Sequence, residues 1–329
     1  MELSFNSYQS LKKWKEEQII KYRYDASALN EFHDLIMKAV ISIALERLKI
    51  VRSPSWKFAW YTMGSSGRKE QGFLSDQDHG LVFEPGAAEA EAEAYFLQLG
   101  EEISKGLYAV GYPYCEGNVM CSNPLWCKSL SKWKRQIQTW MQEESLQTIR
   151  NLHIFYDSRV LAGQKDYIAE LKSFIHMNIQ KSPHLLTRMM ETSMHIKKSV
   201  GPFGQILTEE KGSHQGDLDL KYAAFIPYVN AVRILAVKEG LLETSTIARM
   251  SKLKEMNGYK EEMGKYKSNF AALLKWRLQS YRQTDTYDDT HYIKLKSLSK
   301  SERNELKNIL KDGKKLHQFV IRAIEEGAD

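Results

Sequence analysis

The sequence of 329 residues has only three cysteines, and their spacing restricts what they can do. Cys115, Cys121 and Cys127 follow one another at intervals of six. Structural zinc sites usually need four ligands, paired about two to four residues apart, so this spacing gives zinc little support. An odd number of cysteines also favours reduced thiols over a disulfide framework. We therefore expect free thiols and a cytoplasmic protein.

Long apolar runs are also missing. No stretch approaches the ~20 consecutive apolar residues of a membrane-spanning helix, and the first residues lack a basic region followed by a hydrophobic one. The contents of 43% hydrophobic and 27% charged residues are those of an ordinary soluble protein, not of a disordered one. We therefore expect no membrane partner.

The sequence has no dense block of positive charge. Lysine and arginine number 47 against 41 acidic residues, a net charge of +6, and Lys and Glu alternate through 248–283 and 294–326. A nucleic-acid interface would usually be denser, so nucleic acid is not favoured as a partner. Neither an internal repeat nor a low-complexity tract is present.

A short loop rich in small residues is the first feature that points to chemistry. The apolar and aromatic run at 58–63 predicts a buried strand that leads into Gly64. Gly64 and Gly67 permit positive φ and a close approach of backbone N–H groups, while Ser65 and Ser66 add hydroxyl donors. This loop and the helix start after it are predicted to hold a triphosphate. An ordinary hairpin loop is the simpler alternative.

Two acids follow the loop at the start of a second predicted strand, 77–83. Asp76 and Asp78 are two residues apart, so their side chains point to the same face, about 7 Å apart along the chain. Two such carboxylates can share divalent ions, Mg²⁺ or Mn²⁺, which can clamp both oxygens of an in-line displacement. A solvated strand entry with Asx-turn chemistry is the alternative.

The longer pattern resembles a known family. Gly64-Ser65-x-Gly67-Arg68-x-Glu70, followed by Ser75-Asp76-x-Asp78, resembles the signature of the DNA polymerase β superfamily in its PII uridylyltransferase and glutamine synthetase adenylyltransferase branch. It is most similar to the nucleotidyltransferases often found behind CBS domains. The resemblance covers roughly residues 30–260. Its further segments are Gly111–Met120, Ser122–Trp126, Asp157-x-Arg159, Gly163, Pro202–Gly204, Gly216–Lys221 and Ala231–Arg233, the last three resembling the accompanying substrate-binding domain.

The resemblance implies transfer of a nucleoside monophosphate from an NTP to an acceptor, most concretely a protein side chain, as in PII uridylylation. Asp76 and Asp78 would be the catalytic and metal-binding residues, and Gly64–Arg68 would bind the nucleotide. A catalytically weak nucleotide sensor is the alternative from another class. A transferase that modifies nucleic-acid ends is disfavoured by the dispersed charge.

The third metal-binding acid of the superfamily is missing from its usual place. It normally comes from the next strand, predicted here near 118–122, and residues 117–123 contain no acid. Glu116 and Asp157 are the nearest candidates. Asn118 and Asn123 are neutral and would hold a metal weakly. The missing acid favours the sensor, whereas the intact Asp pair favours the enzyme.

The predicted fold class is α+β, with a small mixed-sheet nucleotidyltransferase domain over 1–164 and an all-α helical bundle over 165–329. Two N-terminal helices should cover the sheet, the second begun by Asp25 or Ser27. Trp126, Trp133 and Trp140 are expected to form a buried helical stripe. The other expected helices are 87–109, 145–157, 165–181, 184–200, 218–239, 243–255, 260–283 and 303–326.

Several charged residues outside the Asp pair remain open between two roles. Lys221 could reach a phosphate, and Arg233 could stack on a base or pair with Asp219; surface ion pairing is the alternative for both. Asp217 or Asp219 could equally cap the helix that follows. Arg68 could meet the triphosphate or pair with Glu70 to brace the loop. The nucleotide is expected between the Asp pair and the helix after Gly216.

Overall fold

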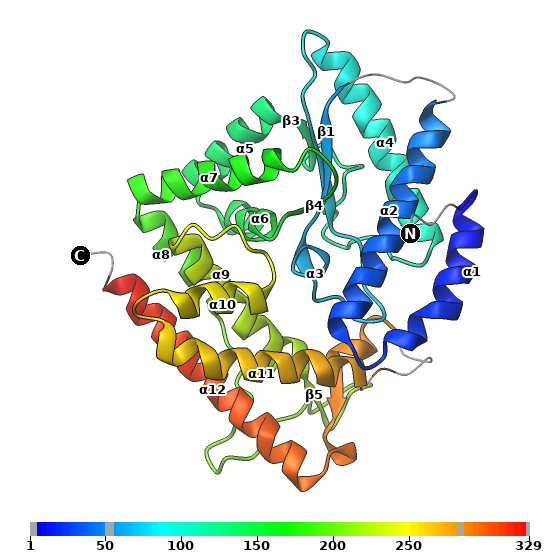
Figure 1. Cartoon of the computed structure of the whole chain (residues 1–329). Helices are drawn as coiled ribbons and strands as arrows, with labels where there is room; N and C mark the ends of the chain where they lie inside the picture. The colour runs from blue at the N-terminus through cyan, green and yellow to red at the C-terminus, as the bar shows by residue number, and fades with distance from the viewer. Residues whose placement is uncertain (1–4, 50–55, 280, 282–285, 327–329) are drawn as a thin grey trace. The chain divides into compact units, whose positions relative to one another are not determined.

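The computed structural model describes residues 5–49, 56–279, 281 and 286–326. It divides into unit 1, Met1–Glu143 with Ile154–Ile175, and unit 2, Glu144–His153 with His176–Asp329. Unit 1 contains a mixed sheet with helices, and unit 2 is mainly helical (Figure 1). The α+β fold class is therefore confirmed, while the domain boundary between 164 and 165 stays a prediction.

The sheet of unit 1 has the strand order β3-β2-β1-β4. Its central strand β1 is antiparallel to both neighbours, β2 and β4, whereas β3 runs parallel to β2. The strands are β1 Phe58–Thr62, β2 His79–Phe83, β3 Cys127–Ser129 and β4 Arg159–Gly163. The first two lie where the sequence predicted them.

The prediction of a strand near 118–122 is wrong. The chain forms turns there, and the third strand lies at Cys127–Ser129. Asn118 has a φ of +53°, in the left-handed region that an extended strand does not use. A turn at Gly117-Asn118 therefore interrupts any extended run, and the third strand forms only after Trp126.

Alternate residues of the strands serve two different cores. Trp60, Leu81 and Phe83 belong to the core beneath α1 Tyr8–Gln18, α2 Ala26–Lys49 and α4 Glu89–Ala109. On the other face, Tyr61 contacts Trp133 of α5 Leu130–Glu143 and Phe155 of α6 Leu146–Tyr156. Figure 1 shows α2 and α4 on one side of the sheet and α5 on the other. Burial on both faces follows from the apolar character of these strands.

The helical predictions for unit 1 are confirmed with small changes. Asp25 accepts a hydrogen bond from the Ala28 N–H at 3.0 Å and so begins α2, while the helix before it ends in a 3-10 turn, η1 Ile19–Tyr22. The three tryptophans are buried against one another, but Trp126 precedes β3 and does not belong to the helix.

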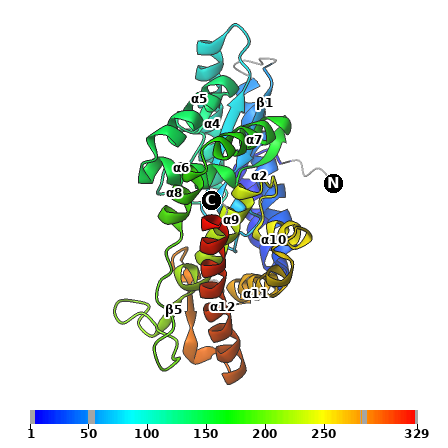
Figure 2. The ribbon, with the colours of Figure 1, turned by 90° about the vertical axis from the view of Figure 1, so that its left-hand side faces the viewer.

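Unit 2 is built mainly from helices, which Figure 2 shows from a second side. They are the end of α7 Asp166–Lys181, α8 His184–Ser193, α9 Ile226–Lys238, α10 Thr246–Glu255, α11 Lys260–Gln279 and α12 Lys300–Glu325. Helix α8 is shorter than predicted. The last residues of the helix predicted over 260–283 lie outside the described residues, apart from Tyr281. A capping box of Ser299 and Glu302 begins α12 three residues early.

One correction concerns the predicted all-α character of the bundle and its helix over 218–239. Asp217–Asp219 forms a strand, β5, antiparallel to β6 Tyr292–Lys294. The chain then passes through a π-helical turn, η2 Lys221–Phe225, into α9. In Asp217-Leu218-Asp219 an apolar residue lies between two acids, and both Leu218 and Asp219 are buried. Two short 3-10 turns, η3 Asp289–His291 and η4 Leu295–Ser297, flank β6.

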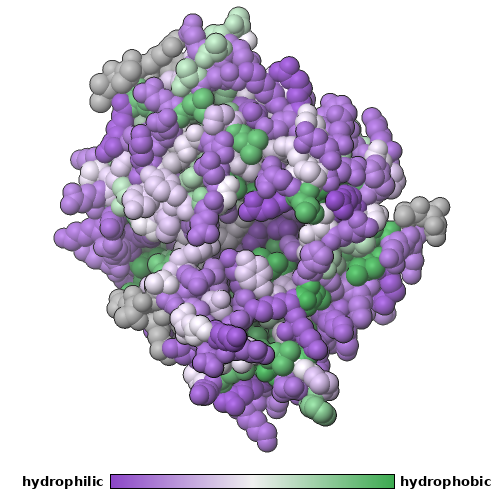
Figure 3. All heavy atoms as spheres, turned by 180° about the vertical axis from the view of Figure 1, so that it is seen from behind, coloured by the Kyte–Doolittle hydropathy of each residue, from purple (hydrophilic) through white to green (hydrophobic). Residues whose placement is uncertain are grey.

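The surface shows no sign of an extended apolar region on the face in Figure 3, where apolar side chains are scattered among hydrophilic ones. Among the described residues, no helix is both long and apolar enough to span a membrane.

Candidate functional site

The turn after β1 is closed by a glycine that no other residue could replace without strain. Gly64 begins the short helix α3 Gly64–Gly67 with a φ of +54°, as its predicted freedom allowed. A Cβ on Gly64 would lie 2.1 Å from Oδ2 of Asp78, which shows how closely the turn approaches that carboxylate. The amides of a first helical turn have no partner within the helix, so those of Gly64 to Ser66 can serve another acceptor.

The second glycine has a different role from the predicted one. Gly67 is not among the residues with positive φ. A Cβ there would lie 2.1 Å from the Asp157 carbonyl oxygen and 2.9 Å from that of Thr62. Gly67 is therefore required because the turn packs closely on neighbouring backbone.

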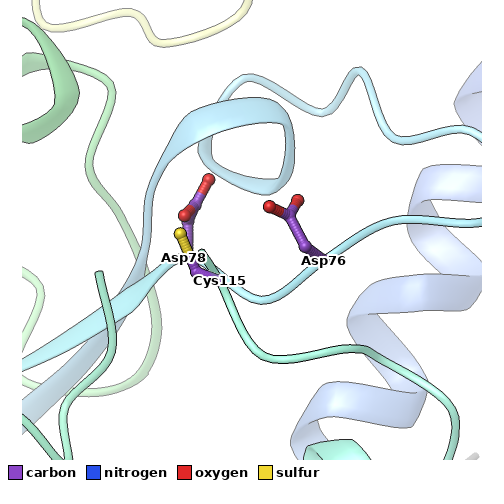
Figure 4. A group of neighbouring side chains, drawn as sticks. All are labelled: Asp76, Asp78 and Cys115. Atoms are coloured by element: carbon purple, nitrogen blue, oxygen red, sulfur yellow. The ribbon is translucent and has the colours of Figure 1, made fainter. Parts of the chain in front are cut away.

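Asp76 and Asp78 lie in the extended segment just before β2, on one face of it. Ser75, Gln77 and His79 are buried, whereas the two acids between them are partly exposed. The acids precede the first strand residue, so they do not lie in the strand itself as predicted, but the alternation holds. One carboxylate oxygen from each acid and Sγ of Cys115 all lie within 4.8 Å of one another. Figure 4 shows the three side chains around one space.

The buried face of this segment is fixed by hydrogen bonds. The Gln77 Nε2 donates to the carbonyls of Ser104 and Tyr112, at 3.3 and 3.1 Å, and its Oε1 accepts from Nε2 of His79 at 2.9 Å. Nδ1 of His79 accepts from the Cys121 N–H at 3.4 Å. Burial lowers the pKa of His79 to about 3, so its ring is neutral at physiological pH. These contacts hold the segment in place and so direct Asp76 and Asp78 outward.

The third group beside the acids is a thiol from a loop, not an acid from a strand. Burial, helped by Asp78 and Asp76, raises the pKa of Cys115 to about 12. Glu116 is exposed and is not part of the group. Asp157, the more distant candidate, is engaged elsewhere, as described next. Cys115 was missed because the third ligand was sought among acids; its place within the segment Gly111–Met120 was the available signal.

Arg68 braces the loop through a buried ionic triad. Its Nε donates to Glu70 and its Nη1 to Asp157, both at 2.7 Å, and all three side chains are less than 10% exposed. Burial by itself lowers the pKa of Arg68, but the two carboxylates outweigh it and hold the pKa above its usual value. Of the two roles left open for Arg68, bracing is the one that these contacts describe.

A second arginine clamps the same turn from the start of β4. Arg159 forms a bidentate pair with Asp34 of α2, at 2.7 and 2.8 Å, and donates to the Ser66 carbonyl at 3.0 Å. Asn30, one helical turn earlier, accepts from the Gln71 N–H at 2.9 Å. Helix α2 therefore holds the loop along its length. Because Arg159 is itself held by Asp34, its hydrogen bond to the Ser66 carbonyl fixes the backbone of the turn. The N–H groups of the turn are then preorganised.

The two serines of the loop differ in position. Ser65 lies with its Oγ 3.2 Å from Oγ of Ser75, on the partly exposed side. Ser66 is buried, and its hydroxyl faces Sδ of Met37 at 3.5 Å. Only the backbone of Ser66 can therefore take the predicted nucleotide-binding role in this conformation.

The Asp pair fits a divalent cation. Carboxylate oxygens are the ligands that Mg²⁺ and Mn²⁺ prefer, and Mg²⁺ usually binds one or two carboxylates while keeping waters and substrate phosphates. The partial exposure of Asp76 and Asp78 leaves room for such additional ligands. Asp76 and Asp78 are the residues that would hold the ion.

The residues of unit 2 that were predicted to bind the nucleotide make hydrogen bonds and ion pairs within unit 2. Asp219 accepts from the Tyr222 N–H at 3.0 Å, the capping role that was left open for it, and Lys197 lies 3.2 Å away. Lys221 lies with its Nζ 3.4 Å from Nε2 of His291. Arg233 is buried in α9 and donates to Oδ1 of Asn230 at 2.8 Å. The nucleotide roles of Lys221 and Arg233 stay predictions.

Comparison with protein families gives two matches. Residues 14–147 match the family model described as putative nucleotidyltransferase DUF294, and residues 183–324 match the one described as putative nucleotidyltransferase substrate binding domain. No curated protein matches the chain. The first match contains the Gly64 turn, both aspartates and Cys115, and the second covers most of unit 2. The chain belongs to the DUF294 family of putative nucleotidyltransferases.

Proposed function

We propose that this protein transfers a nucleoside monophosphate from an NTP to a side chain of an acceptor protein, in the manner of the PII uridylyltransferases. The observation that carries the proposal is the approach of the Gly64 turn to within van der Waals contact of Asp78, beside Asp76. The first turn of α3 and two carboxylates thus lie side by side. That combination suits a metal-bound triphosphate.

Each part of the site has a role in the proposed reaction. The N–H groups of the turn bind the β- and γ-phosphates, and Asp76 and Asp78 hold the divalent ions. An acceptor hydroxyl loses its proton to solvent and its oxygen bonds to the α-phosphorus, while the bond to pyrophosphate breaks on the opposite side. Mg²⁺ or Mn²⁺ neutralises charge on the attacking and leaving oxygens when bound. The chain itself supplies a rigid frame through Arg68 and Arg159.

A protein acceptor is supported by three features. The resemblance is to enzymes that modify proteins, and the second family match is described as a substrate binding domain. The net charge of +6 is spread along the chain and gives no dense footprint for nucleic acid. Three unpaired thiols fit the reducing cytoplasm, which we propose as the location.

The test is incubation of the purified protein with cell lysate, Mg²⁺ or Mn²⁺, and each NTP labelled in turn at the α- or γ-phosphate. We expect one α-label to enter a protein band, no γ-label to do so, and EDTA to abolish labelling. Asp78→Asn should label nothing, whereas Glu116→Gln, which neutralises an exposed acid outside the group, should label normally. Transfer of the γ-label would instead show a kinase and contradict the proposal.

A nucleotide sensor is the second candidate, favoured by one observation. Among the described residues, the group that could hold a metal has two carboxylates and a thiol where the superfamily usually has a third acid. A site with two carboxylates holds divalent ions less well than a site with three. We expect this to slow nucleotidyl transfer more than it weakens nucleotide binding. Tight Mg-NTP binding by the wild type, with no transferred label for any NTP, would favour the sensor.

A further inference from the structure

Cys115 is held beside the Asp pair by the backbone on both sides of it. The Gln77 N–H donates to the Pro113 carbonyl at 3.1 Å, and the His79 N–H donates to that of Val119, also at 3.1 Å. The loop between Pro113 and Val119 is therefore pinned to the residues on either side of Asp78. Within it, the Asn118 N–H donates to the Cys115 carbonyl at 2.9 Å and closes a turn.

The thiol of Cys115 lies close to both acids. It is hydrogen-bonded to Asp78, and Sγ lies within 4.8 Å of the ligand oxygens of both aspartates. All three side chains are partly exposed, so a cation can reach them from solvent. Figure 4 shows Cys115 adjacent to Asp78 with Asp76 facing them.

The other two cysteines differ from Cys115 in their burial and in their distance from the acids. Cys121 is buried, with its Sγ 3.1 Å from Nδ1 of His79. Cys127 is buried in β3. Neither lies in the group with the two acids. Of the three cysteines, Cys115 alone lies beside the two acids, and its loop places it there.

We propose that Asp76, Asp78 and Cys115 form a three-ligand site for Zn²⁺, and that Zn²⁺ bound there displaces the Mg²⁺ or Mn²⁺ of the proposed reaction. Thiolate is a soft ligand that selects zinc over magnesium, and three protein ligands with one open position are typical of accessible zinc sites. Zinc–ligand bonds of about 2.0–2.3 Å would draw the three atoms together by at most roughly 1.5 Å. The thiol proton leaves to solvent as the sulfur–zinc bond forms.

The site would thus discriminate between two classes of cation. Mg²⁺ and Mn²⁺ use the carboxylates and leave the thiol protonated, whereas Zn²⁺ recruits all three groups. Binding of Zn²⁺ in this way does not depend on the proposed transfer, but its regulatory consequence rests on the proposed function. Zinc would act as an inhibitor that competes with the working metal.

The test uses Co²⁺ as a spectroscopic stand-in for Zn²⁺ on the full chain, without nucleotide. A sulfur-to-cobalt charge-transfer band should appear in the wild type and in Cys127→Ala, and be absent in Cys115→Ser. Competition with Co²⁺ should show Zn²⁺ affinity lowered at least about tenfold in Cys115→Ser. Paramagnetic resonance of bound Mn²⁺ should show unchanged Mn²⁺ affinity in both variants, and Zn²⁺ should displace Mn²⁺ readily only where Cys115 is present.

Two results would overturn the inference: a charge-transfer band that persists in Cys115→Ser, or Zn²⁺ affinity that is equal in the wild type and Cys115→Ser. Thermal unfolding of both cysteine variants establishes that they are folded before the metals are compared. Failure of the proposed function gives a different result. In that case labelled NTP transfers nothing, yet the cobalt band of the wild type still appears and still depends on Cys115.

Discussion

The two segments predicted to contact the nucleotide, 64–79 in unit 1 and 216–233 in unit 2, differ in how their charged side chains are held. In the first, charged side chains are buried and joined to distant parts of the chain, as Arg68 is to Asp157 at 2.7 Å. In the second, Asp219 accepts from the Tyr222 N–H and lies 3.2 Å from the exposed Lys197, while the backbone of Asp217–Asp219 pairs with β6. The first segment is therefore held by a buried ion triad, and the second by strand pairing and by an ion pair with an exposed partner.

This difference indicates where the geometry of the site is most strictly determined. A buried ion pair that is well hydrogen-bonded holds its groups in one arrangement, and breaking it leaves a charge without compensation. Preorganised N–H groups need no rearrangement when a phosphate binds. We therefore expect substitutions in 64–79 to have large effects and those in 216–233 to have small ones.

The largest effect is expected from removal of the buried guanidinium. Arg68→Met leaves Glu70 and Asp157 buried without their partner, so the free energy of unfolding should fall by about 3–5 kcal/mol. Urea unfolding followed by circular dichroism measures it. In a triple variant, Arg68→Met with Glu70→Gln and Asp157→Asn, much of the stability should return because no charge remains buried alone. Equal destabilisation in the single and triple variants would show that packing, and not charge, is the cause.

The next effect concerns binding and not folding. Asp76→Asn or Asp78→Asn should lower affinity for Mg-NTP by about a hundredfold or more, since each removes a direct metal ligand. Removing one of two neighbouring negative charges relieves repulsion, so the unfolding free energy should be unchanged or slightly higher. Isothermal titration with Mg-NTP tests this, with Glu116→Gln as the control for loss of one acid. Wild-type affinity in both aspartate variants would remove these residues from the site.

A smaller effect is expected at the turn. Gly64→Ala places a methyl group 2.1 Å from Oδ2 of Asp78 and forces a left-handed φ on alanine. The strain costs about 1–2 kcal/mol, and displacement of Asp78 should weaken Mg-NTP binding about tenfold, equivalent to about 1.4 kcal/mol. Ser66→Ala is the matched control, because its hydroxyl makes only the contact with Met37 and faces away from the acids. A larger loss of binding in Ser66→Ala than in Gly64→Ala would contradict this geometry.

The smallest effect is expected in unit 2. Lys221→Gln removes one partly exposed charge, which is worth up to about 1 kcal/mol, so Mg-NTP affinity should fall no more than about fivefold. Lys211→Gln, an exposed lysine in the preceding loop, is the control. Hydrogen exchange with and without Mg-NTP sharpens the comparison: protection of both 64–80 and 214–233 supports a nucleotide role for Lys221 and Arg233. Protection confined to 64–80 would assign unit 2 to partner binding.

Much of the fold follows from local patterns in the sequence. The apolar runs at β1 and β2, the alternation around Asp76 and Asp78, and the caps of α2 and α12 depend on residues close together in the chain. Their periodicity is a property of strand and helix geometry, so it is visible without the structure. Four strands were not predicted at their observed places: β3, β5 and β6 have three residues each, and β4 has five. Segments so short have too little pattern to outweigh the contacts that pair them with a distant strand.

The candidate site also has features that the sequence predicts and features that depend on tertiary structure. The sequence by itself determined that two carboxylates face one way beside a glycine turn, because strand alternation and the freedom of glycine are local properties. Only the tertiary structure decided that Arg68 binds Asp157, that Ser66 points into the core, and that Cys115 lies beside Asp78. Each of these depends on segments separated by helices and strands, and their meeting is fixed by how the whole unit packs, which no spacing along the chain encodes.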